Sequence, residues 1–260
     1  MARATPLRVA WLTTGRGPGS YGALEYVLES ILQGLPVEIA VAFVNRAPGD
    51  YEATDRLIDM VRSADIPLEA LSSVAFRKAH GGRLSKPGEA LPAWRREFDS
   101  EVASRLQRHD FSIGVMFGYM LIATEPLFDS FPMLNDHPAL PDGPVGTYQE
   151  VIHQLMASRA TESGCMMNLV TAHVDRGPAI SYCRYSIRDE ENQDLWERHP
   201  SGLGKKEAER SALFTDLRAR GIRRERPFVV ETLRVIAEGE LQIPPPEPVD
   251  LTVDVEAGLG

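Results

Sequence analysis

The chain has 260 residues, 43% of them apolar and 25% charged, with a formal net charge of −9. This composition is ordinary for a soluble globular protein, and the length fits one large domain or one domain with a small appendage. No run approaches the roughly 20 apolar residues of a membrane helix, and a strand begins too early to leave room for a signal peptide. We therefore expect a cytoplasmic protein without a membrane partner, and the acidic balance argues against nucleic-acid binding.

The chain opens with the pattern of a strand, a glycine-rich turn and a helix. Residues 8–14 are a short apolar run, residues 15–22 read Gly-Arg-Gly-Pro-Gly-Ser-Tyr-Gly, and apolar residues then recur at helical spacing to Leu35. Backbone N–H groups at such a helix start can hold a phosphate, and Arg16 could add charge. The turn lacks the lysine of the NTPase phosphate loop and the glycine spacing of dinucleotide-binding proteins, so alone it is equally well a tight turn.

Strand and helix patterns go on alternating to about residue 187. Apolar or alternating runs predict strands over residues 37–44, 68–74, 132–138, 166–172 and 179–187, and the run 111–122 predicts a central strand that passes into a loop. Helical spacing predicts helices around residues 57–61, 94–106 and 146–157. Residues 77–92, rich in Gly, Lys, Arg and Pro, read as an exposed loop that either covers a ligand or is a disordered insertion. Cys165 and Cys183 fall among the strands and are expected to be small buried hydrophobes.

This alternation is the pattern of an α/β fold with a doubly wound, mostly parallel sheet, whose ligands lie beyond the carboxyl ends of the strands. We expect one domain over residues 1–187 and a divergent extension over 188–260. The extension is polar and charged up to about residue 226, is predicted to be helical over 228–237, and then has a proline-rich spacer at 244–248. Residues 249–255 alternate as in an edge strand, which could pair with a second copy of the chain.

An amide, an imidazole and a carboxylate are predicted to meet at that sheet edge. Asn135 and His137 are two residues apart, so in a strand that ends at Pro138 their side chains leave from the same face. Asp175 follows His137 by 38 residues, which is enough for a crossover helix and a parallel strand that return it beside the histidine. No metal is required by this set of residues.

Three motifs resemble the folate-dependent formyltransferases, and most of all the glycinamide ribonucleotide transformylases. They are Gly-Tyr-Met-Leu-Ile at 118–122, Asn-Asp-His-Pro-Ala-Leu-Pro at 135–141 and Asp-Arg-Gly-Pro-Ala-Ile at 175–180. The last two at this separation are specific, and the resemblance runs from about Arg8 to Ile187. It implies a Rossmann-like formyltransferase fold, one-carbon chemistry with 10-formyltetrahydrofolate as the formyl donor, a small amine as acceptor, and a place in purine biosynthesis.

The resemblance also implies roles for individual residues. Asn135, His137 and Asp175 would be catalytic. The folate pterin would rest against the segment around Leu121 and the loop at 171–175, which gives the donor-binding residues Met120, Leu121, Ile122, Thr171, His173 and Val174. The substrate phosphate would lie on the glycine-rich turn, and a family arginine matches Arg95, which gives the substrate-binding residues Gly15, Arg16, Gly17, Gly19, Ser20 and Arg95.

Departures from the family pattern leave the acceptor amine open. Asp136 stands between the catalytic pair where the family has an apolar residue, Leu121 replaces an arginine, and the phosphate turn carries two extra residues. A hydrolase of 10-formyltetrahydrofolate, with water as acceptor, is one alternative. A non-catalytic folate- or nucleotide-binding regulator is another, since a second carboxylate at residue 136 could disturb the protonation of His137.

Overall fold

The computed structural model describes residues 5–84, 89–200 and 202–259. The chain folds into two compact units. The first runs to Asn135 and takes in Leu169–His173, and the second comprises Asp136–Asn168 and the chain from Val174 onward. These units do not coincide with the predicted division at residue 187, which stays a prediction about where the catalytic domain ends.

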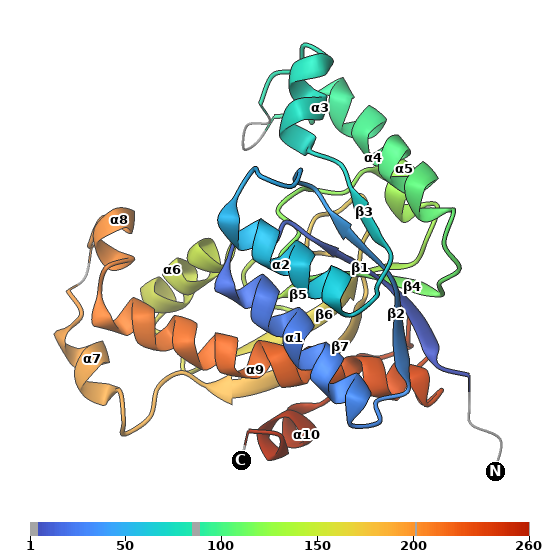
Figure 1. Cartoon of the computed structure of the whole chain (residues 1–260). Coiled ribbons are helices and arrows are strands. Elements are labelled where there is room, and N and C mark those ends of the chain that lie inside the picture. Colours follow the sequence, from blue (N-terminus) through green and yellow to red (C-terminus); the bar gives the residue numbers. More distant parts are fainter. Residues whose placement is uncertain (1–4, 85–88, 201, 260) are drawn as a thin grey trace. The chain divides into compact units, whose positions relative to one another are not determined.

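The first unit contains alternating strands and helices (Figure 1). They are β1 (Leu7–Thr13), α1 (Pro18–Leu32), β2 (Val37–Val44), α2 (Glu52–Ser63), β3 (Leu68–Ala70), α3 (Ser73–Ala79), α4 (Ala93–Leu106), β4 (Ile113–Met116), α5 (Glu125–Phe128) and most of β5 (Met133–His137). The second unit takes the end of β5, then α6 (Tyr148–Ser158), β6 (Glu162–Leu169), β7 (Ala179–Ser186), α7 (Gln193–Arg198), α8 (Lys205–Ala208), α9 (Ala212–Ala237), β8 (Val249–Asp250) and α10 (Thr252–Ala257).

The strands follow the order β3-β2-β1-β4-β5-β6-β7-β8. β1 pairs in parallel with β2 and β4, β2 with β3, β4 with β5, and β7 with β8, whereas β6 and β7 are antiparallel. The prediction of an α/β fold with a mostly parallel sheet is therefore confirmed. Because parallel strands end at the same edge, the segments that follow β1, β2 and β4 lie at one edge of the first unit.

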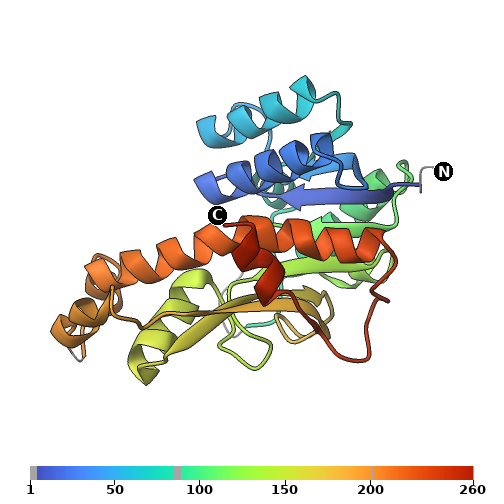
Figure 2. The ribbon, with the colours of Figure 1, turned by 90° about the horizontal axis from the view of Figure 1, so that it is seen from below.

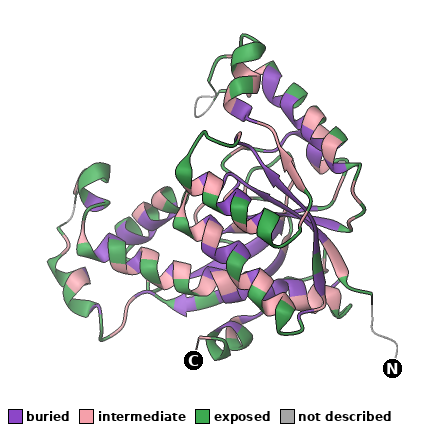
Figure 3. Ribbon diagram, in the orientation of Figure 1, coloured by how far each residue is buried: buried purple, intermediate pink, exposed green. Residues whose placement is uncertain are grey.

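Apolar periodicity decides which faces are buried. The residues of β1 from Val9 to Leu12 are fully buried, as expected of a parallel strand covered on both faces. On α4 the four-residue spacing of Phe98, Val102 and Leu106 gives one fully buried stripe, which alternates with exposed positions in Figure 3. Cys165 and Cys183 are buried opposite each other on β6 and β7, as predicted for small apolar side chains. Within the described residues, no helix has the length and apolar character needed to cross a membrane.

Several predicted strands are shorter than expected because a turn or cap intervenes. β3 stops at Ala70, since the Ser72 hydroxyl accepts from the Ala75 N–H (3.3 Å) and starts α3. β4 ends at Met116 and the chain passes into a loop, as predicted for the run 111–122, where Gly118 with its positive φ of 63° turns the chain. β6 spans 162–169 and not 166–172. The predicted loop at 77–92 starts inside α3, and residues 85–88 lie outside the described residues, so its role over a ligand stays a prediction.

The C-terminal part is more helical than predicted. Helix α9 has 26 residues, far more than the segment 228–237, and is capped by Ser211, whose hydroxyl accepts from the Phe214 N–H (3.2 Å). The predicted edge strand over 249–255 is wrong beyond β8, which pairs with β7. The Asp250 carboxylate accepts from the Thr252 N–H (3.0 Å) and turns the chain into α10. α10 packs against α9 and β7 within the second unit (Figure 2).

Candidate active site

His137 is the last residue of β5, and its side chain is 2% exposed. Its Nε2 lies 2.9 Å from the carbonyl oxygen of Pro144, and its Nδ1 lies 3.7 Å from Oδ2 of Asp175. The structure therefore brings together His137 and Asp175, which the sequence separates by 38 residues. Pro144 was not predicted as a neighbour, and no local pattern identifies it.

The position of Asp175 is fixed by its own backbone conformation and by a hydrogen bond from another backbone segment. Its φ of 53° is in the left-handed region, which aspartate tolerates better than most residues do. Its Oδ2 accepts from the Gly146 N–H (3.3 Å), so the same oxygen faces both that amide and the imidazole. The carboxylate is thus positioned by the loop that leads into α6 before any ligand arrives.

Both ring nitrogens of His137 face hydrogen-bond acceptors. A neutral imidazole can donate to only one of them, whereas an imidazolium can donate to both. This arrangement suits a histidine that carries a positive charge for part of a reaction cycle and returns a proton afterwards.

Asn135 lies on the same strand, two residues before His137, and pairs with Met116 of β4. It belongs to the first unit and His137 to the second. The alternation of side chains along a strand puts residues 135 and 137 on the same face of β5.

The glycine-rich turn follows β1 and leads into α1. Gly15 has a φ of 68°, its N–H donates to the Thr13 hydroxyl (3.1 Å), and its carbonyl accepts from the Thr54 hydroxyl (3.3 Å). Gly17 is the N-cap of α1, which has no side-chain cap and no acidic residue in its first turn. Gly19 and the buried Ser20 lie in that first turn. The turn therefore presents a helix start that favours an anion, and the phosphate contact expected there stays a prediction.

The segment after β4 is tied to the glycine-rich turn. The Met120 N–H donates to the Thr14 hydroxyl (2.8 Å), and the Thr14 N–H donates to the Gly118 carbonyl (3.1 Å). Met120 and Ile122 are 67% and 44% exposed, whereas Leu121 packs against the core. The side chains of Met120 and Ile122 are thus accessible to a flat hydrophobic ligand, whereas the side chain of Leu121 is turned toward the core.

The loop after β6 contributes the other predicted donor-binding residues. The His173 N–H donates to the Thr171 hydroxyl (3.2 Å), which makes a local turn within the first unit. Val174 begins the next segment of the second unit and is 47% exposed.

The sequence comparison identifies the family. A family model described as formyl transferase matches residues 58–206, which is more than half of the chain and includes β5, His137 and Asp175. The chain belongs to the formyl transferase family. No curated protein matches the sequence.

Solved structures of formyl transferases share the fold. Glycinamide ribonucleotide transformylase 1 of Symbiobacterium toebii is 25% identical, with a TM-score of 0.63 over 90% of this chain and 89% of that one. The phosphoribosylglycinamide formyltransferase of Coxiella burnetii is 21% identical, with a TM-score of 0.61 over 90% and 88%. That of Bacillus halodurans is 22% identical, with a TM-score of 0.57 over 88% and 94%. The resemblance seen in the motifs is therefore confirmed for the family and the fold.

In this formyl transferase, Arg95 does not reach the surface. Its side chain is on α4, the residue is 2% exposed, and Nη2 donates to the Ile122 carbonyl (2.6 Å). Its predicted contact with substrate stays a prediction, and in the structure its guanidinium holds the backbone carbonyl of Ile122.

Asp99 supports the same segment and was not predicted. Its Oδ2 accepts from the Thr124 N–H (2.6 Å) and hydroxyl (2.8 Å), and the residue is fully buried. Burial raises the pKa of Asp99 to about 6, although the nearby Arg95 and the bonds from Thr124 act in the opposite direction. The only sequence signal was its spacing of four from Arg95 on a helix.

Asp136 lies between Asn135 and His137 on β5, and its side chain points to the opposite face of the strand. Its Oδ1 is buried with no hydrogen-bond partner among the described residues. Burial raises its pKa, the nearby Glu225 raises it further, and Arg218 acts in the opposite direction. Alternation along β5 explains the outcome, because residue 136 points to the opposite face from residues 135 and 137.

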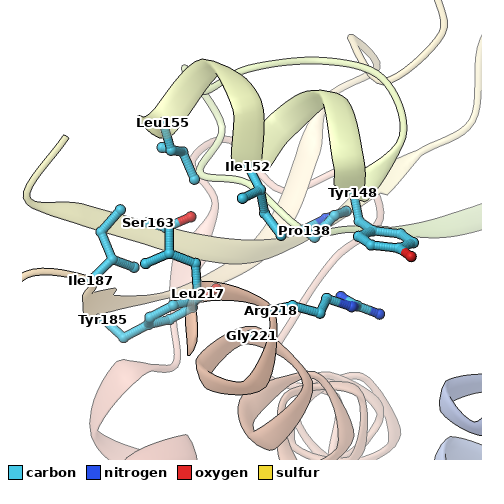
Figure 4. Close-up of a pocket in the computed structure, with 10 residues that line it drawn as sticks. All are labelled: Pro138, Tyr148, Ile152, Leu155, Ser163, Tyr185, Ile187, Leu217, Arg218 and Gly221. Carbon is cyan, nitrogen blue, oxygen red and sulfur yellow. The ribbon is translucent and has the colours of Figure 1, made fainter. Parts of the chain in front are cut away.

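Two hollows in the molecule do not belong to this site. A cavity of about 20 Å³ lies between α6, β6, β7 and α9, where Arg218 stacks over Tyr148 at 4.3 Å (Figure 4). It has room for about one water molecule, since a water needs roughly 10–15 Å³ by this measure. An open groove of the first unit runs along α1 and α2 to Val37, which starts β2 and so lies at the opposite strand end. Among the described residues, no three His, Cys, Asp or Glu side chains gather as metal ligands.

Proposed function

We propose that this formyl transferase moves the formyl group of 10-formyltetrahydrofolate to the amine of a small, phosphorylated substrate. The observation that carries the proposal is the buried His137 with Asp175 3.7 Å from its Nδ1, at the end of the strand that also bears Asn135. The exposed apolar side chains of Met120 and Ile122 suit the donor's pterin, and Thr171, His173 and Val174 are proposed to complete that surface. Membership of the family and the names of the structural neighbours support the reaction class.

Asn135 and His137 would act on the formyl oxygen. As the amine attacks the formyl carbon, that oxygen gains negative charge, which an amide N–H and an imidazolium N–H can stabilise. Asp175 would hold the imidazolium and, directly or through a water, take the proton of the attacking amine and return it to the leaving nitrogen of the donor. The bond from formyl carbon to the acceptor nitrogen forms and the bond to the donor nitrogen breaks, with no net change in protons.

The acceptor amine is proposed only as a class. Glycinamide ribonucleotide is the acceptor suggested by the names of the structural neighbours, which would place the reaction in purine biosynthesis. The two extra residues in the turn at 15–22 leave sugar-nucleotide amines as the other candidate class. Cytoplasmic localisation and pairing of two copies through the C-terminal extension stay predictions.

The test is an assay of formyl loss from 10-formyltetrahydrofolate, run with and without glycinamide ribonucleotide. Wild type should show amine-dependent turnover, and Asn135→Ala or His137→Ala should lower it by about 100-fold or more, the usual effect of losing one such donor. His109→Ala is the matched control, because His109 also lies beside a carboxylate (Glu69, 3.1 Å) but between α4 and β4, at the strand start.

Other outcomes would redirect the proposal. Turnover that needs no amine would assign a hydrolase. Tight folate binding without turnover on a wide amine panel would assign a regulator. Full turnover in His137→Ala would refute the proposed catalytic role.

A further inference from the structure

A buried arginine, which has no ion pair within the described part of the chain, lies at the same sheet edge as the glycine-rich turn. Arg46 follows β2, is 8% exposed, and has no carboxylate within ion-pair distance among the described residues. Its Nη1 donates to the Asn45 carbonyl (2.7 Å) and the Ser73 hydroxyl (2.8 Å), both of them neutral. Buried charges in proteins are ordinarily paired, because removing an isolated charge from water is costly.

Two further donors are left unused, one in this guanidinium and one on the residue before it. Nε of Arg46 and Nδ2 of the fully buried Asn45 have no hydrogen-bond partner among the described residues. Buried donors are nearly always satisfied in folded proteins, so two orphans on adjacent residues leave hydrogen-bonding capacity for an acceptor from outside the chain. Asp50, a carboxylate whose charge acts on Arg46, already accepts from the Ala47 N–H (2.9 Å) and the Ser72 hydroxyl (3.1 Å).

A second arginine adds positive charge to the same place. Arg16 of the glycine-rich turn stacks over the Tyr51 ring at 4.4 Å, and the Arg46 guanidinium lies 6.0 Å from the same ring centroid. Burial and the charge of Arg16 both lower the pKa of Arg46. Arg16 and Tyr51 are exposed, so rotation of these two side chains would open Arg46 to a ligand.

Asn45 and Arg46 lie next to the glycine-rich turn, where the phosphate of the acceptor is expected. β1 and β2 run parallel with Thr13 beside Val44, and the Asn45 N–H donates to the Thr13 carbonyl (3.3 Å). Asn45 and Arg46 therefore follow β2 next to the point where the turn at 15–20 follows β1, near the uncapped start of α1. Two guanidinium groups suit a dianion better than a carboxylate with a single charge.

We propose that Asn45, Arg46 and Arg16 form a phosphoryl-binding subsite at the carboxyl ends of β1 and β2, which holds a phosphoryl group of the acceptor. The identification of the ligand as the acceptor rests on the proposed formyl transfer, whereas the subsite itself does not. Arg46 makes the charged contact, Asn45 supplies a neutral donor, and Arg16 turns from Tyr51 onto the bound anion.

The experiment is calorimetric titration of inorganic phosphate into wild type and three variants, in the absence of folate and amine. Arg46→Met should weaken phosphate binding by about tenfold or more, because it removes a charge-assisted, multidentate contact. Arg16→Met should weaken it to a smaller degree. Arg56→Met is the matched control: Arg56 is an exposed arginine of α2 paired with Glu52 (3.6 Å), and its loss should leave phosphate affinity as in wild type.

Equal phosphate affinity in wild type and Arg46→Met would overturn the subsite, as would acetate binding as tightly as phosphate. If Arg46→Met fails to fold, Arg46→Lys keeps the charge with fewer donors and should still weaken binding, and the exposed Arg16→Met tests the subsite independently. Failure of this titration would leave formyl transfer untouched. Loss of the proposed function would show instead as absent turnover in a protein that still binds phosphate.

Discussion

Replacing Asp99 by asparagine should raise the free energy of unfolding relative to wild type, and this gain should be larger at neutral pH than in acid. The pKa of this buried carboxyl is raised from 3.8 to about 6. At about 1.36 kcal/mol per pKa unit, ionising it costs the folded state about 3 kcal/mol. A raised carboxyl pKa means that the folded state binds more protons than the unfolded state between pH 4 and 6, so this group's contribution to stability falls as the pH rises through that window.

The asparagine variant lacks this loss and keeps an oxygen that can accept both bonds from Thr124. Urea unfolding of wild type and Asp99→Asn at pH 4, 5, 6 and 7.5 measures the difference in unfolding free energy at each pH. That difference should shift in favour of the variant by about 3 kcal/mol across the series. Asp129→Asn, which removes an exposed carboxylate, controls for the loss of one negative charge. If this difference in unfolding free energy does not change with pH, or changes in favour of wild type, the pKa of Asp99 is not raised by burial and the reasoning is refuted.

Four further substitutions test the site and its supports. Gly118→Ala should destabilise by about 1–3 kcal/mol in urea unfolding, because φ is positive and a Cβ would lie 2.2 Å from the Ser20 hydroxyl; an unchanged midpoint would contradict this geometry. Thr147→Ala removes the side-chain cap of α6 and should cost about 1 kcal/mol in the same assay, with no cost expected if the cap contributes nothing. Met120→Ala should raise the KM for 10-formyltetrahydrofolate with little change in stability, because the Met120 side chain is exposed. Leu121→Ala should instead cost about 2 kcal/mol or more of stability, because Leu121 packs against the core. A stability loss in Met120→Ala and a raised KM in Leu121→Ala would show that these two side chains are misassigned.

Much of the framework follows from local patterns. The apolar runs at 8–14 and 37–44 are β1 and β2, and the four-residue spacing from Phe98 to Leu106 is the buried stripe of α4. Such patterns are readable because a parallel strand covered on both faces, or a helix with one covered face, needs apolar residues at a fixed period. The same period of two predicts that residues 135 and 137 share a face, and it also sends Asp136 the other way.

Only the tertiary structure decides which neighbours a polar side chain meets. The sequence contains Arg46, Arg95 and Asp99 without any sign that they are buried, because burial depends on segments that come from elsewhere in the chain. The Pro144 carbonyl beside His137 and the orphan donor of Asn45 are likewise products of loop conformation. Local periodicity determines which faces of a helix or strand must be buried. Long-range packing determines which segment buries them, and therefore the charge and hydrogen bonding of each buried group, and no short stretch of sequence contains that information.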